Sequence, residues 1–185
     1  MYYFIVVKMI LEKDNYYHLY NRSINEEKQF YNRENYIYFL KKYNKLVNLV
    51  NTLAYCLMPT HFHFLIKVTI QENNILKRAV GDMLSGYAKA INKQQNRHGS
   101  LFEQHTKAKA IKSQKQLIAL VHYIHQNPIR SKLVKKLEDW EFSSYRDYIR
   151  VREGKLPAKE EILSQYKNLD EFIEHSNMTI DWDYE

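Results

Sequence analysis

Two short apolar runs on either side of a proline-containing turn constrain the fold of this chain most strongly. The first run covers residues 53–58, a Pro-Thr pair follows, and the second run covers residues 61–68 with the sequence HFHFLIKV. Short apolar runs bounded by turn residues are typical of strands. A tight connection makes two consecutive strands pair antiparallel. The sequence therefore predicts a β-hairpin over residues 53–68.

The segments around this hairpin predict further strands and helices. Residues 16–21 alternate between two faces and are rich in strand-forming side chains, and residues 107–111 are expected to form another strand. Helical spacing or helix-forming composition predicts helices over residues 35–50, 74–94 and 113–126, with shorter pieces over residues 143–150 and 160–175. The order strand, helix, hairpin, helix, strand, helix favours an α+β fold, a ferredoxin-like antiparallel sheet flanked by helices.

Length and composition indicate one domain. The chain has 185 residues, of which 45% are hydrophobic, so it can bury a substantial core, and it shows no internal repeat or linker. The single cysteine, Cys56, excludes an internal disulfide and a zinc site built on cysteines. Residues 46–66 carry no charged side chain, but their Asn, Thr, Pro and His residues are too polar for hydrocarbon, so we expect no membrane span. The N-terminal sequence MYYFIVVK lacks the features of a secretory signal, so we expect a cytoplasmic protein.

Charge and aromatic content give the first indication of function. The chain carries 28 Lys and Arg against 21 Asp and Glu, a net charge of +7, and 16 of its residues are tyrosine. Cationic side chains bind phosphates and aromatic rings stack on unpaired bases, so this combination is typical of nucleic-acid-binding proteins. A basic domain with a tyrosine-rich core would have the same composition, so composition alone leaves both interpretations open.

The sequence His61-Phe62-His63-Phe64 is the strongest local indication of chemistry. On a strand, alternate residues share a face, so the two histidines would point to one side and the two phenylalanines to the core on the other. Two neutral imidazoles at this spacing can bind a divalent cation. An isolated pair of this kind is more often two partly exposed histidines on a half-buried strand, and a metal site needs at least a third ligand.

The helix predicted over residues 113–126 offers that ligand. Ser113 is expected to cap this helix and Pro128 to end it. At about 100° per residue, Tyr123 lies roughly 140° from the middle of the apolar stripe, and Asn127 projects from the same face one turn later. Such a tyrosine is either a surface residue or part of a second interface, and the proline is expected to push Asn127 away from helical geometry. Tyr87, by contrast, lies on the apolar stripe of its own helix and is expected in the core.

Several stretches together resemble a known family. They are AYCLMPTHFHF at residues 54–64, GSLFEQ at residues 99–104, YIHQNP at residues 123–128 and WEFSSY at residues 140–145. They are similar to the single-tyrosine transposases of the HUH superfamily, above all to the REP-associated tyrosine transposases, and the similarity runs from about Tyr16 to Tyr148. Thr60 departs from the pattern, because the family usually has Asn before the first histidine. The resemblance implies an HUH-type catalytic domain over residues 1–150, with residues 151–185 as a C-terminal helical extension of the same domain.

The resemblance also implies a reaction and a set of site residues. His61 and His63 match the pair of histidines that binds the metal, Asn127 matches the polar residue that completes the metal site, and Tyr123 matches the nucleophile. The cofactor would be Mg²⁺ or Mn²⁺. The reaction would be cleavage and rejoining of single-stranded DNA, often beside a hairpin, through a 5′-phosphotyrosyl intermediate. The partner would then be single-stranded or hairpin DNA, and the protein would act as a monomer or homodimer.

Basic residues near these motifs are the candidate DNA contacts. As a group they can track a DNA strand while neighbouring aromatic rings stack on bases, whereas each one alone is more often a solvated charge. They are Lys89, Lys93 and Arg97 on and after the second long helix, Lys107, Lys109 and Lys112 around the last strand, and Arg130 and Lys132 after the third helix.

Other functions stay open from the sequence. A non-catalytic relative would hold hairpin DNA without cutting it, but the presence of both histidines, the tyrosine and the asparagine together favours the enzyme. A phosphodiesterase that uses histidines as acid and base would need two separate His-x-Thr or His-x-Ser motifs, and the sequence lacks such a pair. A purely structural metal site would be expected to include cysteines.

Overall fold

Four strands form one antiparallel sheet in the computed structural model, which describes residues 11–180. The strands lie in the order β2-β3-β1-β4, and every neighbouring pair is antiparallel. Their bounds are Tyr16–Arg22 for β1, Val50–Met58 for β2, His61–Val68 for β3 and Lys107–Ile111 for β4. The predicted hairpin is therefore confirmed as β2 and β3, and the two further predicted strands are confirmed as β1 and β4.

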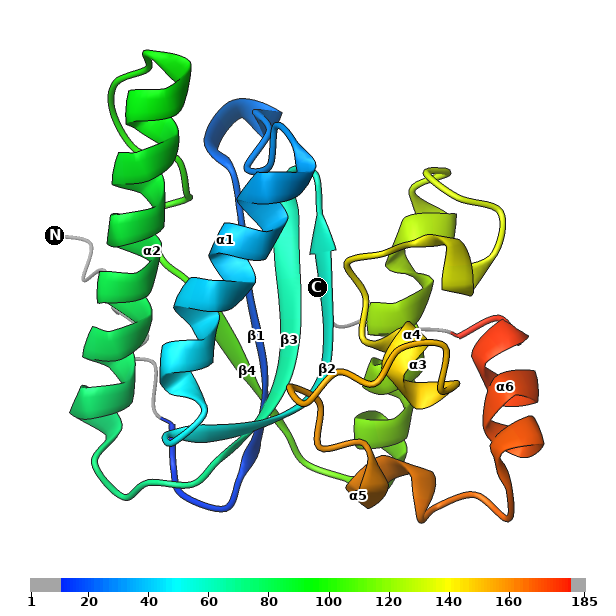
Figure 1. Cartoon of the computed structure of the whole chain (residues 1–185). Helices are drawn as coiled ribbons and strands as arrows, with labels where there is room; N and C mark the ends of the chain where they lie inside the picture. Colours follow the sequence, from blue (N-terminus) through cyan, green and yellow to red (C-terminus); the bar gives the residue numbers. More distant parts are fainter. Residues whose placement is uncertain (1–10, 181–185) are drawn as a thin grey trace, which may run out of the picture.

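Helices cover both faces of this sheet (Figure 1). On one face lie α1 (Arg33–Tyr43) and α2 (Asn73–Gln95), and on the other lies α3 (Gln114–Arg130), which packs against β2 and β3. The shorter elements are α4 (Tyr145–Tyr148), α5 (Glu160–Leu163), α6 (Leu169–Asn177) and 3-10 turns at Ile24–Glu26, Asn44–Leu46 and Leu137–Asp139. The order β1-α1-β2-β3-α2-β4 is that of ferredoxin-like folds, so the predicted α+β class is confirmed.

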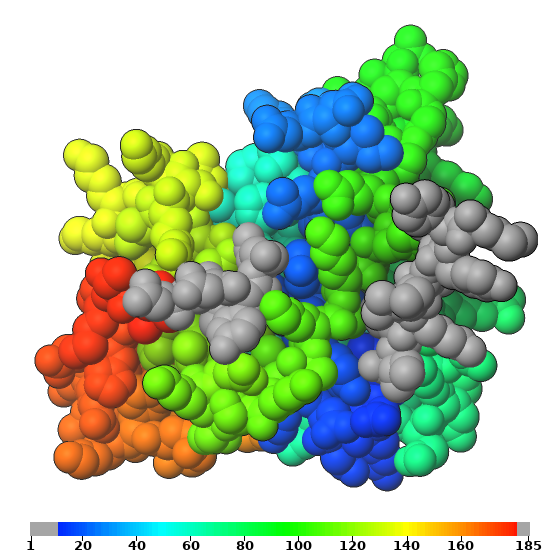
Figure 2. Space-filling model, turned by 180° about the vertical axis from the view of Figure 1, so that it is seen from behind, coloured from blue at the N-terminus to red at the C-terminus, as the bar shows by residue number. Residues whose placement is uncertain are grey.

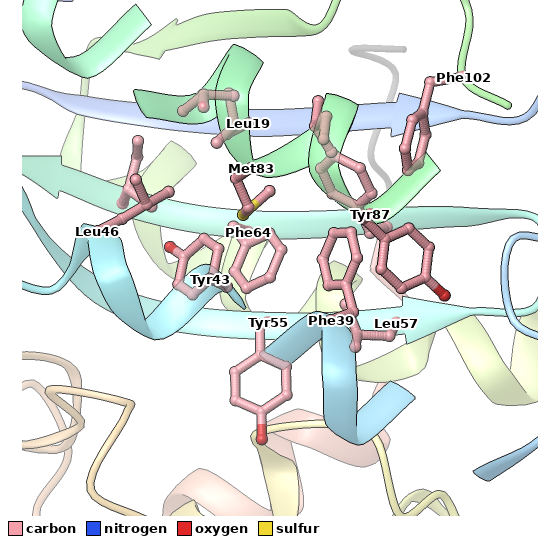
Figure 3. Packing of buried hydrophobic residues seen from close by; sticks show 14 of the residues in the cluster. Leu19, Phe39, Tyr43, Leu46, Tyr55, Leu57, Phe64, Met83, Tyr87 and Phe102 are labelled. Carbon is pink, nitrogen blue, oxygen red and sulfur yellow. The ribbon is translucent and has the colours of Figure 1, made fainter. Parts of the chain in front are cut away.

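The first core lies between the sheet and the helices α1 and α2 (Figure 3). Phe62 and Phe64 of β3 are fully buried in it, as the strand alternation predicts. The Phe64 ring stacks on Tyr43 of α1 with 3.9 Å between ring centroids. Tyr87 is fully buried in the same core, where its hydroxyl donates to the carbonyl of Gln29 at 2.8 Å, so its predicted place is confirmed. This packing assigns one face of β3 to the phenylalanines and leaves the other to the histidines.

The second core lies between the sheet and α3. Leu120 and Ile124 of α3 pack here with Leu65 of β3, and all three are fully buried. Ile162 of α5 and Phe172 of α6 belong to the same core and are also fully buried. Figure 2 shows these C-terminal segments, coloured orange to red, packed beside the yellow-green surface of α3. The chain after residue 150 thus supports α3. The expected domain bounds start at residue 1 and end at residue 185, and both ends lie outside the described residues.

The helix predicted over residues 35–50 has the wrong C-terminal boundary. It ends at Tyr43, and residues 44–46 tighten into a 3-10 turn. Val50, the last apolar residue of the helical pattern, is the first residue of β2, where it is buried. Val47, which the same pattern assigned to the buried face, is 42% exposed. The apolar spacing therefore ran across the junction between a helix and a strand.

The helix α3 also corrects a prediction, because it does not end before Pro128. It continues to Arg130, and the amide of Ser131 donates to the carbonyl of Asn127 at 2.9 Å, so the last turn stays closed. A proline within the last turn costs the helix one amide donor while leaving the following hydrogen bonds intact. The predicted cap is confirmed, since the side chain of Ser113 accepts from the amide of Gln116.

Within residues 11–180, no helix combines the length and apolar character needed to cross a bilayer. The uncharged stretch over residues 46–66 forms β2 and most of β3 instead. One of its buried polar side chains, Thr52, has its hydroxyl 2.8 Å from the hydroxyl of Tyr43.

Candidate active site

The face of the sheet that α3 covers carries both histidines of the His-x-His motif. His61 and His63 are two residues apart on β3, so they share this face. His63 is 3% exposed, whereas His61, at the start of the strand, is half-buried. The centroids of the two rings lie 5.0 Å apart, with an angle of 84° between the ring planes. The two imidazoles therefore lie together on one side of the strand, as its alternation predicts.

Each histidine is held through its Nδ1 atom. The Nδ1 of His61 lies 3.1 Å from the hydroxyl of Thr60, and the Nδ1 of His63 lies 2.9 Å from the Nε2 of His18 on β1. Thr60 is the position that departs from the family pattern, and its carbonyl accepts from the amide of Ser23 at 2.8 Å, which fixes the turn before the histidines. Since Nδ1 is engaged in both rings, Nε2 is the nitrogen through which each ring would bind a metal.

Burial keeps the histidines at the centre of this face neutral. It lowers the pKa of His63 well below the ordinary value for a histidine, and the neighbouring His18, His61 and Arg22 lower it further. Burial also lowers the pKa of His18 to about 3, with a smaller contribution from the charge of Lys109. A neutral imidazole offers a metal ion a lone pair with no proton to displace. His63 is therefore in the protonation state that a metal ligand needs at neutral pH.

Tyr123 reaches the same place from α3. Its side chain is 7% exposed, and its ring meets His63 edge-on, with 5.8 Å between centroids and 83° between planes. It meets His18 in the same way at 6.3 Å and 79°. The guanidinium carbon of Arg130 lies 5.2 Å from the centroid of the Tyr123 ring. The helix pattern left a surface position or a second interface open for this tyrosine, whereas the structure places Tyr123 in the same core between α3 and the sheet as Leu120 and Ile124.

Asn127 lies one helical turn after Tyr123. It is within α3, so the departure from helical geometry expected before Pro128 does not occur. Its side chain is 6% exposed, and its Nδ2 donates to the carbonyl of Tyr123 at 2.9 Å, so Oδ1 is the atom with which it would coordinate a metal. The helix α3 runs antiparallel to β3 (Figure 1). Moving along α3 from Tyr123 to Asn127 therefore follows the same direction as moving back along β3 from His63 to His61.

The donor types on these residues would suit a divalent cation. Within the described part of the chain, no three His, Cys, Asp or Glu side chains are grouped to hold a metal, so a metal bound here would need a third ligand of another type beside the two histidines. The amide oxygen of Asn127 is such a ligand, and two imidazoles with one amide leave coordination positions open for phosphate oxygens.

Two comparisons with known proteins bear on the fold of this chain. A curated protein of Haemophilus influenzae, named "Putative REP-associated tyrosine transposase", is 26% identical over 102 residues, and the match spans 51% of this chain and 58% of that protein. A solved structure of a REP-associated tyrosine transposase bound to a REP hairpin matches with a TM-score of 0.65 and 16% identity, over 77% of this chain and 84% of that one. No protein-family model matches the chain.

The chain has the fold of a REP-associated tyrosine transposase. The resemblance that the sequence motifs predicted is thus confirmed by one curated relative and by one solved structure. The match spans little more than half the length of the curated relative. The similarity therefore shows the fold and the relationship of this chain to these proteins. The reaction is proposed below from the residues of the site.

Three of the predicted DNA contacts border the site of this transposase-like fold. Lys107 and Lys109 of β4 are exposed and lie opposite Tyr20 and His18 of β1, so they share the face that α3 covers. The Nζ of Lys107 lies 5.7 Å from the centroid of the Tyr20 ring. Arg130 is exposed at the end of α3 and lies over the Tyr123 ring. These cations are arranged around the two histidines and the tyrosine.

The other predicted DNA contacts lie further from Tyr123. Lys112 and Lys132 are exposed just before and just after α3. The remaining three belong to the layer of α2, on the opposite face of the sheet, and the guanidinium of Arg97 is bound to the carboxylate of Glu27. They are Lys89, Lys93 and Arg97. The structure thus brings part of the predicted basic set to the site and places the rest apart from it.

Sequence reasoning missed two residues of the site, His18 and Tyr20. Both lie on β1, and their rings stack on each other with 4.4 Å between centroids. The alternation over residues 16–21 already placed Tyr16, His18 and Tyr20 on one face. The missing information was the strand pairing, because β1 lies between β3 and β4 and thereby brings His18 to His63.

Proposed function

We propose that this protein cuts and rejoins single-stranded DNA through a 5′-phosphotyrosyl intermediate on Tyr123, with Mg²⁺ or Mn²⁺ held by His61, His63 and Asn127. The observation that supports this most is the edge-on contact between Tyr123 of α3 and His63 of β3, with 5.8 Å between ring centroids. The two side chains, proposed here as metal ligand and nucleophile, are 60 residues apart in the chain.

The reaction would begin at the hydroxyl of Tyr123. Its oxygen attacks phosphorus in a DNA phosphodiester, the phenol proton leaves to solvent, and the bond from phosphorus to the 3′ oxygen breaks. The 3′ oxygen takes up a proton and leaves as a 3′-hydroxyl, while the 5′ phosphate stays linked to the tyrosine. The energy of the broken ester is conserved in this link, so attack by a 3′-hydroxyl rejoins the strand without ATP.

The neighbours of Tyr123 would assist this attack. A free phenol has a pKa of about 10 and is mostly protonated at neutral pH, so the nucleophile needs activation. The guanidinium of Arg130 lies over the ring, so a positive charge stands beside the proposed nucleophile. His61 and His63 would hold the metal through Nε2 and Asn127 through Oδ1. When bound there, a divalent cation supplies positive charge that polarises and orients the phosphate.

Single-stranded or hairpin DNA is the substrate that the surroundings of the site favour. Lys107, Lys109 and Arg130 border the site and carry the charge that binds a phosphate backbone. Tyr20 lies between His63 and Lys107 in the register of the sheet, so an aromatic ring stands next to a cation there. Cations interleaved with aromatic rings suit unpaired strands. The structurally similar transposase is bound to a REP hairpin, which supports a hairpin as the first substrate to test.

Covalent trapping tests this proposal. Labelled single-stranded oligonucleotides that carry hairpins are incubated with the protein and Mn²⁺ or Mg²⁺, and the products are separated on denaturing gels. We expect a metal-dependent adduct with the wild type and none with Tyr123→Phe or His63→Ala. Tyr87→Phe is the matched control, because it removes a buried tyrosine hydroxyl outside the site at a cost of about 1 kcal/mol and should keep the adduct. DNA binding with no adduct in either metal would replace the enzyme with a hairpin-binding protein.

A further inference from the structure

His18 of β1 is fully buried directly beside the metal-binding face of the site. Its Nε2 lies 2.9 Å from the Nδ1 of His63, and the two rings stack with 5.1 Å between centroids and 23° between planes. On its other sides His18 stacks on Tyr20 and meets the edge of Tyr123. One ring therefore touches both a proposed metal ligand and the proposed nucleophile.

Which imidazole donates the hydrogen bond between His63 and His18 depends on the nitrogen of His63 that carries the proton. A neutral imidazole carries a proton on one nitrogen and a lone pair on the other. If the Nε2 of His63 offers its lone pair to a metal, the proton of His63 is on Nδ1. That proton is then donated to the Nε2 of His18, which accepts, and the proton of His18 is on Nδ1.

The register of the sheet places His18 for this contact. In the pairing of β1 with β3, His18 lies opposite Leu65, and Tyr20 lies opposite His63. The imidazole of His18 thus reaches His63 diagonally across the two strands, a distance that aromatic rings can span on one face of a sheet. An apolar side chain such as leucine would be enough to fill this space. A buried imidazole that is hydrogen-bonded to a metal-binding histidine has a further effect, because such partners orient the histidine and fix its tautomer.

We propose that His18 is a positioning residue that holds His63 with its proton on Nδ1 and its Nε2 directed to the metal. This inference rests on the proposed function, since it assigns His63 a metal to bind. His18 does not touch the DNA or the metal in this role. It acts only through His63.

Three variants separate this role from packing. His18→Leu fills the space without an acceptor, and His18→Gln places an amide oxygen near the position of Nε2. His122→Leu is the matched control, because His122 is 1% exposed and also hydrogen-bonded, but to Ser176 and Tyr166 on the far side of α3. Calorimetric titration with Mn²⁺, in the absence of DNA, gives the metal affinity of each protein, and thermal unfolding gives its stability.

We expect His18→Leu to bind Mn²⁺ about 10- to 100-fold more weakly than the wild type, as for other lost partners of metal-bound histidines. His18→Gln should recover most of this affinity, and His122→Leu should lower the melting temperature while leaving Mn²⁺ affinity unchanged. Wild-type affinity in a folded His18→Leu protein would overturn the inference and leave the proposed function standing. A wild type that binds neither Mn²⁺ nor Mg²⁺, or binds Mn²⁺ equally well after His63→Ala, would overturn both.

Nitrogen NMR of the wild-type histidine rings gives a second test that does not depend on any variant folding. We expect the ring proton of His63 on Nδ1, and the ring proton of His18 on Nδ1 as well. A His63 ring protonated on Nε2 would reverse the direction of the hydrogen bond and contradict the proposal.

Discussion

Acid should destabilise this protein, and His122 of α3 allows the effect to be estimated. Its Nδ1 lies 3.0 Å from the hydroxyl of Ser176 and its Nε2 lies 2.6 Å from the hydroxyl of Tyr166. Burial, followed by the charge of His175, lowers the pKa of His122 from 6.5 to about 4. As the pH falls through 6.5, the unfolded chain binds a proton that the folded protein does not accept until about pH 4, so unfolding becomes more favourable. A difference of about 2.5 in pKa corresponds to about 3 kcal/mol of unfolding free energy.

Urea unfolding at pH 7, 6, 5 and 4 measures this effect. The wild type should lose at least about 3 kcal/mol over this range, and His122→Gln, which takes up no proton, should lose about 3 kcal/mol less than the wild type. His98 is exposed, so His98→Gln is the matched control and should lose stability in parallel with the wild type. Parallel curves for the wild type and His122→Gln would refute the reasoning.

Substitutions at three positions test the packing beneath α3, the proposed metal site and the surroundings of the proposed nucleophile. Phe172→Ala empties a fully buried position beneath α3 and should lower the unfolding free energy by about 3–5 kcal/mol in urea titrations, whereas a loss under 1 kcal/mol would contradict the packing. Asn127→Ala should weaken Mn²⁺ binding and Asn127→Asp should strengthen it, as measured by calorimetry, because a carboxylate adds charge to the same oxygen position. Arg130→Gln should slow adduct formation on denaturing gels, because it removes the cation that lies over the Tyr123 ring; an unchanged rate would argue against a role of Arg130 beside Tyr123.

The sequence predicted the parts of the fold that depend on local patterns. The alternation at His61 to Phe64 correctly separated two faces of one strand, because each strand residue points away from its neighbours. The helical spacing in α3 set Tyr123 apart from the apolar stripe, but the structure buries Tyr123 in the same core as Leu120 and Ile124. Spacing along one helix could not show this, because it depends on how the helix packs on the sheet.

The features that depend on tertiary contacts were not predictable in the same way. The contact between His18 and His63 requires β1 to pair with β3, and residues this far apart in the chain carry no spacing signal for it. The continuation of α3 past Pro128 also depends on context. The last turn stays closed through hydrogen bonds of the residues that follow, which outweigh the ordinary tendency of proline to end a helix.

The central claim is that Tyr123 forms the covalent link to DNA. The most direct measurement is mass spectrometry of the wild-type adduct after digestion with protease and nuclease, which identifies the residue that carries the nucleotide. We predict a 5′-phosphate remnant on the peptide that contains Tyr123, formed only in the presence of Mn²⁺ or Mg²⁺. A remnant on any other tyrosine, or on a residue of another type, would contradict this assignment of the site.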